Sequence, residues 1–191
     1  VAEADCVLIV SDHPKETNLP QLSLSDICDA ASDSVPEYKP SPEDLAMIMY
    51  TSGSSGLPKG VPITHAGYSW ALRRFTGLAE TMAEKTGLVP APLFHMNGQF
   101  HLLNLLSCGA HVVLMKQFSA RGMLEAIDQH DVVRVTGVPT MAALMAEIIE
   151  SGTSARTGHV EQVGLGSSPL SKLLLARIQA AFPNATVTNG F

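Results

Sequence analysis

The sequence predicts an α/β protein with mostly parallel sheets and flanking helices, and three observations support this fold class. Short apolar runs of strand length alternate with longer stretches in which apolar residues recur every three or four positions. Gly, Pro and Ser residues separate the two kinds of segment. The composition, 46% hydrophobic and 16% charged over 191 residues, is that of a globular protein with a sizeable core. Strands that alternate with helices in this way form βαβ units and parallel sheets.

Residues 1–44 carry the weakest structural signals. The apolar run 6–10 predicts a short buried strand, and the rest of this stretch is rich in Pro, Ser, Asp and Glu, with one weak helical segment at 24–31. The next apolar run, 45–50, predicts a buried strand that presents the following loop at its carboxyl end. We therefore expect 1–44 to be a strand with a surface connection and 45–191 to hold the core of the domain.

The remaining elements alternate regularly. Thr64 is a suitable N-cap for a helix, and Pro139 is a suitable first residue for another that ends before Ser151 and Gly152. The apolar stripe of the first of these helices runs through Tyr68, Leu72, Phe75, Leu78 and Met82. We expect further strands at 87–91, 111–115, 132–136, 160–165 and 185–188, and further helices at 97–107, 120–130 and 170–182.

The segment from Thr51 to Gly60, TSGSSGLPKG, combines the features of a phosphate-binding loop. Glycines let the backbone approach an anion closely, hydroxyls and free N–H groups donate hydrogen bonds, and a lysine adds a mobile positive charge. The residues that we expect to contact phosphate are Thr51, Ser52, Gly53, Ser54, Ser55, Gly56 and Lys59.

Two other interpretations of this loop fit less well. A flexible Ser/Gly linker needs neither a preceding apolar strand nor a Pro-Lys-Gly ending. A Walker-type loop fails on spacing, because Pro58 stands where the second glycine belongs and Gly60 replaces the Ser or Thr that follows the lysine.

Entered from Ile-Met-Tyr and followed by Val-Pro-Ile-Thr-His, this loop resembles the phosphate-binding signature of the adenylate-forming (AMP-binding) ligases. This superfamily includes acyl-CoA synthetases, peptide-synthetase adenylation domains and beetle luciferases. The resemblance extends over residues 45–191, with four signatures in the same order, and implies part of the large N-terminal domain of an acyl-CoA synthetase-like fold.

The run Pro92-Leu-Phe-His-Met-Asn-Gly98 resembles the second signature of the family, a turn that lines the carboxylate site. The resemblance implies that His95 orients the substrate carboxylate and that Met96, Asn97 and Gly98 contact the substrate. Taken alone, His95 also fits a structural role. Amino-acid-activating members carry an aspartate in this region, and this run has none, which favours an acid without an α-amino group.

Two further segments resemble the nucleotide-binding signatures. One of them comprises Gly166, Ser167, Ser168 and Pro169, which resemble the segment that passes under the adenine in this family. A strand-to-helix turn with a Ser N-cap fits the same residues. The final residues Asn189, Gly190 and Phe191 match the start of an aromatic motif whose ring packs on adenine. In the family this motif continues into a phosphate-binding threonine and a magnesium-binding glutamate, positions that come after Phe191.

An apolar acyl or aryl pocket is compatible with several side chains near these motifs, most of which also suit an ordinary core. They are Leu93, Phe94, Met96, Phe100, Val138 and Met141.

Other function classes are disfavoured. A net charge of −6 with 5% aromatic residues argues against nucleic-acid binding. The spacing of His95, His101, Cys108 and His111 fits no tight zinc motif, so we expect no metal ligands among them. Three scattered cysteines suit a reducing, cytoplasmic location, and no apolar run has the length of a membrane-spanning helix. Because the chain begins at Val1, the sequence does not decide whether a targeting segment lies further upstream.

By resemblance, the chain is expected to be a fragment of an ATP-dependent acyl-CoA synthetase, acting on a fatty or aryl acid with ATP, Mg²⁺ and coenzyme A. The carboxylate becomes an acyl-adenylate and is then transferred to coenzyme A. We expect the isolated fragment to be inactive, because the magnesium glutamate and the domain with the catalytic lysine come later in the family. A peptide-synthetase adenylation domain and a non-catalytic nucleotide-binding or interaction module remain alternatives, and homo-oligomerisation stays open.

Overall fold

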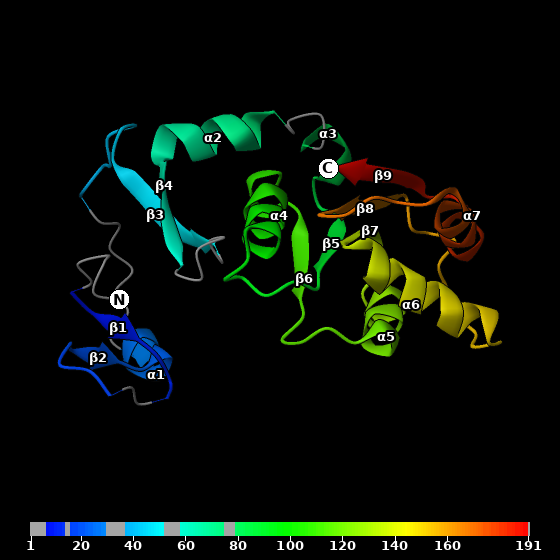
Figure 1. Cartoon of the computed structure of the whole chain (residues 1–191), viewed down its shortest axis with the longest axis horizontal. Helices are drawn as coiled ribbons and strands as arrows, with labels where there is room; N and C mark the ends of the chain where they lie inside the picture. The colour runs from blue at the N-terminus through cyan, green and yellow to red at the C-terminus, as the bar shows by residue number, and fades with distance from the viewer. Residues whose placement is uncertain (1–6, 14–15, 30–36, 52–57, 75–78, 191) are drawn as a thin grey trace. The chain divides into compact units, whose positions relative to one another are not determined.

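The computed structural model describes residues 7–13, 16–29, 37–51, 58–74 and 79–190 (Figure 1). The chain divides into two compact units, Val1–Tyr68 and Ser69–Phe191, and the division falls within helix α2 (His65–Arg73). None of the described helices is long and apolar enough to cross a membrane.

The first unit opens with a parallel pair of short strands, β1 (Ile9–Val10) and β2 (Gln21–Leu22), followed by α1 (Leu24–Asp29). A reciprocal cap starts α1, because Ser23 Oγ accepts from the Asp26 N–H and Asp26 Oδ2 accepts from the Ser23 N–H, both at 3.0 Å. A strand within 6–10 and the weak helix are confirmed within the described residues, but the prediction that this strand is buried is wrong, since Ile9 is half-buried and Val10 is 48% exposed. Strand β2 was not predicted, since two residues carry no periodic signal.

The second part of this unit is an antiparallel hairpin of β3 (Leu45–Thr51) and β4 (Lys59–Thr64). A strand at 45–50 is confirmed, but the prediction that it is buried is wrong. Its residues are half-buried or exposed, with Tyr50 at 44% exposure, and β4 is its strand partner. Strand β4 was missed because Pro62 within it weakens the pattern and is tolerated only at a sheet edge.

Helix α2 begins as predicted and ends earlier. Thr64 Oγ1 accepts a hydrogen bond from the Gly67 N–H at 3.1 Å, so Thr64 is the expected N-cap. The helix ends at Arg73, and a separate short helix, α3 (Ala79–Met82), contains the last residue of the predicted stripe. Phe75 and Leu78 lie outside the described residues.

The second unit contains a five-stranded, fully parallel sheet in the order β6-β5-β7-β8-β9. The alternating pattern and the mostly parallel sheet are therefore as predicted. The strands are β5 (Thr86–Val89), β6 (His111–Leu114), β7 (Val132–Gly137), β8 (Gln162–Gly166) and β9 (Thr186–Gly190). The helices are α4 (Met96–Ser107), α5 (Ala120–Gln129), α6 (Pro139–Glu150) and α7 (Lys172–Ala181) (Figure 1).

One face of this sheet holds the main hydrophobic core. Leu88, Val135 and Val163 stand opposite one another on β5, β7 and β8 and are fully or almost fully buried. Helices α5, α6 and α7 supply their partners, including Ile127 and Ile178. Burial of each such side chain stabilises the fold by roughly 1.5–3 kcal/mol.

The opposite face differs because side chains alternate along each strand. Helix α4 covers part of it, where Leu105 packs in a second cluster with Val89, Met82 and Ala110. The register continues this face across Arg134 of β7, Gln162 of β8 and Thr186 of β9. These are polar residues, so this part of the face is not a second apolar core.

Candidate active site

A cavity of about 710 Å³ lies between α4 and the polar face of strands β7, β8 and β9. Its wall comes from separate segments of the second unit, brought together by the parallel sheet. The lining residues are Met96, Asn97, Phe100, His101, Arg134, Gln162, Gly164, Leu165, Gly166, Ser167, Thr186, Thr188, Asn189 and Gly190.

Two glycines of β8 form the floor of this cavity. A Cβ on Gly164 would lie 3.8 Å from both Arg134 Nη2 and Thr188 Oγ1, and a Cβ on Gly166 would lie 3.6 Å from Asn97 Nδ2. A side chain longer than a methyl group at either position would therefore occupy the space beneath α4. The missing side chains keep the cavity open along the strand.

The carboxyl end of the cavity is a turn between β8 and α7. Ser167 has a φ of 69°, a conformation that few residues other than glycine adopt, and Asn189 Nδ2 donates to the Ser168 carbonyl at 3.3 Å. Ser171 caps α7 by accepting from the Leu174 N–H at 3.2 Å. A strand-to-helix turn is therefore present here as the sequence allowed, but the capping serine is Ser171 and not Ser167 or Ser168, because α7 begins only at Lys172.

The structure brings several of the predicted nucleotide-binding residues together at this end. Gly166, Ser167, Asn189 and Gly190 all line the cavity, from β8 and the neighbouring edge strand β9. Ser168 and Pro169 belong to the same turn but are not among the lining residues. Phe191 lies outside the described residues.

The predicted carboxylate-site residues meet this cavity at the start of α4. Met96 and Asn97 line it, whereas His95 is exposed at the N-cap position and packs its ring against Phe94, with the two centroids 4.5 Å apart. His95 forms no side-chain cap hydrogen bond. Gly98 is buried behind the helix start, where a Cβ would lie 2.5 Å from the carbonyl oxygens of two preceding residues, Ala91 and Pro92.

The opposite end of the cavity contains a buried cation. Arg134 is only 9% exposed, and its Nη1 donates to Oε1 of Gln162. Its Nε has no hydrogen-bond partner in the described part of the chain. Burial lowers the pKa of Arg134, although a guanidinium stays charged at neutral pH. Burial, and secondarily the charge of Arg134, lowers the pKa of His101 to about 4, so its imidazole is neutral at pH 7.

Sequence reasoning missed Arg134 as a cavity residue. The available signal was a single charged residue within the apolar run Val132-Val-Arg-Val135, a pattern that is unusual for a strand covered on both faces. Its position in the cavity depends on strand order and register, which the chain sequence does not display.

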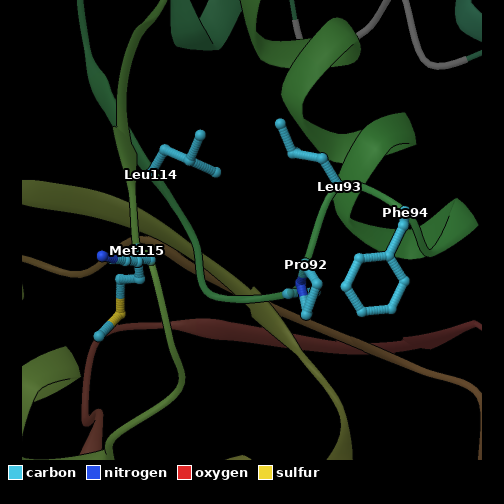
Figure 2. Close-up of a pocket in the computed structure, with 7 residues that line it drawn as sticks. Pro92, Leu93, Phe94, Leu114 and Met115 are labelled. Atoms are coloured by element: carbon cyan, nitrogen blue, oxygen red, sulfur yellow. The ribbon is translucent and has the colours of Figure 1, made fainter. Parts of the chain in front are cut away.

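A second, shallower hollow of about 420 Å³ lies beside the turn that precedes α4. Figure 2 shows Pro92, Leu93 and Phe94 on one side of it and Leu114 and Met115 on the other. Of the side chains expected in an acyl pocket, Leu93 and Phe94 line this hollow, and Phe94 is 75% exposed. Met96 and Phe100 line the large cavity instead, and Val138 and Met141 line neither.

The phosphate loop is described only at its two ends. Thr51 and Lys59 are paired across β3 and β4, and Thr51 Oγ1 lies 3.5 Å from the Lys59 carbonyl oxygen. The predicted residues Ser52, Gly53, Ser54, Ser55 and Gly56 lie outside the described residues. Within the described ranges, no group of three or more His, Cys, Asp or Glu side chains could hold a metal ion.

Comparisons with known proteins agree with the fold and the motifs. A family model for AMP-binding enzymes matches residues 2–191. A feruloyl-CoA synthase from Amycolatopsis sp is 38% identical over 120 residues, which cover 62% of this chain and 24% of that protein. A 4-coumarate-CoA ligase from Narcissus pseudonarcissus is 32% identical over 201 residues, covering 97% of this chain and 34% of that protein.

Solved structures share the fold at lower identity. The o-succinylbenzoate coenzyme A synthetase from Bacillus subtilis matches with a TM-score of 0.79 and 22% identity, over 100% of this chain and 40% of that one. The inhibitor-bound N-terminal domain of FACL13 from Mycobacterium tuberculosis matches with a TM-score of 0.77 and 24% identity, over 90% of this chain and 43% of that one. The chain spans about a quarter to a third of the length of the two curated relatives.

Proposed function

We propose that this chain, which belongs to the AMP-binding enzyme family, is part of a ligase that activates a carboxylic acid with ATP and transfers the acyl group to coenzyme A. The carboxylate attacks the α-phosphorus of ATP and expels pyrophosphate, and the thiol of coenzyme A then displaces AMP from the acyl-adenylate. The observation that carries this proposal is the convergence of two sequence motifs, through Asn97 and Gly166, on one cavity.

The nucleotide contacts in this proposal follow the motifs. The loop from Thr51 to Gly60 would hold the β- and γ-phosphates, where hydroxyl and N–H donors stabilise the charge that develops on leaving pyrophosphate. The segments Gly166–Pro169 and Asn189–Phe191 would contact the adenine. We propose Mg²⁺ as the accompanying ion, although the described residues contain no acidic cluster that would hold it.

The substrate carboxylate would sit at the start of α4. The first N–H groups of a helix attract anions, and no side chain caps this helix end. The exposed His95 ring at the N-cap can hydrogen-bond a carboxylate oxygen and orient it towards phosphorus. Met96 and Asn97 continue from this point into the cavity, and Gly98 keeps the helix start close to the preceding turn.

The cavity favours an acid without an α-amino group. No Asp or Glu is among its lining residues, so it offers no counter-charge for a substrate ammonium. We therefore propose a carboxylic acid without an α-amino group, of the fatty or aryl class, in preference to an amino acid. The names of the curated relatives, a feruloyl-CoA synthase and a 4-coumarate-CoA ligase, point the same way.

We also propose a cytoplasmic location for the enzyme. The free thiols of Cys28 and Cys108 suit that reducing compartment.

We propose further that the isolated 191 residues form no acyl-adenylate at a useful rate. In the family, the magnesium-binding glutamate and the catalytic lysine occupy positions after Phe191. Incubating the purified chain with ATP and a panel of acids should yield no acyl-AMP by mass spectrometry. Acyl-AMP accumulation over successive turnovers would contradict this expectation.

The role of His95 can be tested in the polypeptide that the complete reading frame encodes. His95→Ala should lower kcat/KM for acyl-AMP formation roughly a hundredfold, the usual effect of losing a group that positions and polarises a reacting atom. His111→Ala, which changes an exposed histidine at the start of β6, serves as the control and should keep wild-type kinetics. Equal activity of the two variants would remove His95 from the proposed site.

A further inference from the structure

Arg134 occupies one end of the large cavity, and the turn between β8 and α7 occupies the other. Arg134 is in register with Gln162 of β8, and Gly166 lies four residues further along the same strand. At about 3.3 Å per residue, this separation is roughly 13 Å. An acid whose carboxylate lies at the carboxyl end of the strands would therefore direct its tail towards Arg134.

No carboxylate compensates the charge of Arg134 within the described residues, although the coulombic interaction with Cys108 partly opposes the effect of burial on the pKa of Arg134. None of the ion pairs in the described part of the chain includes Arg134, and no Asp or Glu lines the cavity. Its hydrogen-bond partner Gln162 is neutral, and the neighbouring His101 is neutral at pH 7. A buried cation without a counter-ion is energetically unfavourable, and a bound anion removes that penalty.

One nitrogen of the guanidinium borders the open space of the cavity. Nη1 is engaged by Gln162, while Nε has no partner in the described part of the chain. Nη2 lies next to the space that a Cβ on Gly164 would fill. Nη2 can therefore donate a charge-assisted hydrogen bond to a carboxylate oxygen in that space.

We propose that Arg134 binds a second carboxylate at the far end of the acyl substrate, so that the enzyme activates a dicarboxylic acid. This inference rests on the proposed ligase function and specifies its substrate. The carboxylate near His95 reacts with ATP, and the one held by Arg134 is chemically unchanged. Gln162 fixes the guanidinium plane, and Gly164 provides the space in which the second carboxylate lies.

The test uses the polypeptide encoded by the complete reading frame and three acids of equal length, which end in a carboxylate, a phenolic hydroxyl or a methyl group. Acid-dependent pyrophosphate exchange gives kcat/KM for each. The wild type should prefer the carboxylate-ended acid over the methyl-ended acid by roughly ten- to a hundredfold, the usual strength of a hydrogen bond to a charged group.

Three variants then assign the preference to Arg134. Arg134→Met should abolish it, mainly through a higher KM for the dicarboxylic acid, and Arg134→Lys should retain part of it. Arg121→Met, at an exposed position on α5, is the matched control and should retain the full preference. If Arg134→Met does not fold, the wild-type acid panel and Arg134→Lys still decide.

The outcomes separate the two proposals. If the wild type catalyses exchange but kcat/KM for the methyl- or phenol-ended acid equals or exceeds that for the dicarboxylic acid, the proposed role of Arg134 is wrong. The ligase proposal is not affected by that result. An unchanged preference in Arg134→Met also overturns it. Exchange with no carboxylic acid, or only with amino acids, overturns the ligase proposal and this inference with it.

Discussion

At the residue scale, single positions decide the shape and charge of the cavity. Gly98 lets α4 start close to the turn before it, Gly164 and Gly166 leave the space above β8, and Arg134 places a positive charge at one end. The polar and small residues that line the cavity lie on the sheet face opposite the main core.

Gly98→Ala tests the close approach at the start of α4. The added Cβ would lie 2.5 Å from two backbone oxygens, so the helix start must shift, and we expect a loss of roughly 1–3 kcal/mol in the free energy of unfolding. Urea denaturation of the purified chain measures this loss. Gly122→Ala on α5 is the control, since its nearest contacts lie at 3.4 Å and alanine favours helix by about 1 kcal/mol. Equal stability of Gly98→Ala and wild type would contradict the close approach.

The depressed pKa of His101 predicts a pH dependence of stability. Between pH 6.5 and about 4 the unfolded chain binds a proton on this residue and the folded chain does not, so stability falls as the pH is lowered through this window. The contribution of His101 to the free energy of unfolding is fully present above pH 6.5 and is lost as the pH falls to about 4. It amounts to at most roughly 3 kcal/mol.

His101→Gln should flatten this dependence, because glutamine does not titrate. Thermal unfolding at pH 7, 6, 5 and 4 measures the difference between the variant and the wild type. His111→Gln, at an exposed position, should retain the wild-type slope. Parallel curves for His101→Gln and wild type would show that His101 titrates normally.

At the element scale, the sequence predicts the helices and strands of the second unit well. It predicts the hairpin of the first unit and the burial of individual strands less well. Periodic apolar residues place α5, α6 and α7 to within about two residues, and Pro139 marks the start of α6. The exposed hairpin partner β4 gave no such signal, and β3 was wrongly expected to be buried. Arg134 and His101 were not predicted to share a cavity, because their proximity arises from pairing between distant segments of the chain.

Ser171→Ala tests how α7 and the turn before it are fixed. Loss of the hydrogen bond from the Leu174 N–H to Ser171 Oγ should lower the free energy of unfolding by about 1 kcal/mol. Denaturant titration measures the change, and Ser154→Ala, at an exposed position outside regular structure, should be neutral. A neutral Ser171→Ala would mean that the cap does not stabilise α7.

At the scale of the whole molecule, a net charge of −6 contrasts with the positive charge buried in the cavity. Anionic substrates would be weakly repelled at a distance and held locally by buried donors, which salt screens much less than surface charges. The family membership, the parallel sheet of the second unit and the cavity lined by two motifs support the proposal that the parent protein is an AMP-forming ligase for an acid without an α-amino group.

The most direct test of this account is acid-dependent exchange of labelled pyrophosphate into ATP, catalysed by the polypeptide that the complete reading frame encodes. Fatty, aryl, dicarboxylic and amino acids are compared at equal concentration, with a reaction lacking acid as the control. The account predicts exchange with acids that carry no α-amino group and little or none with amino acids. Exchange with amino acids alone, or with no acid in the panel, would contradict it.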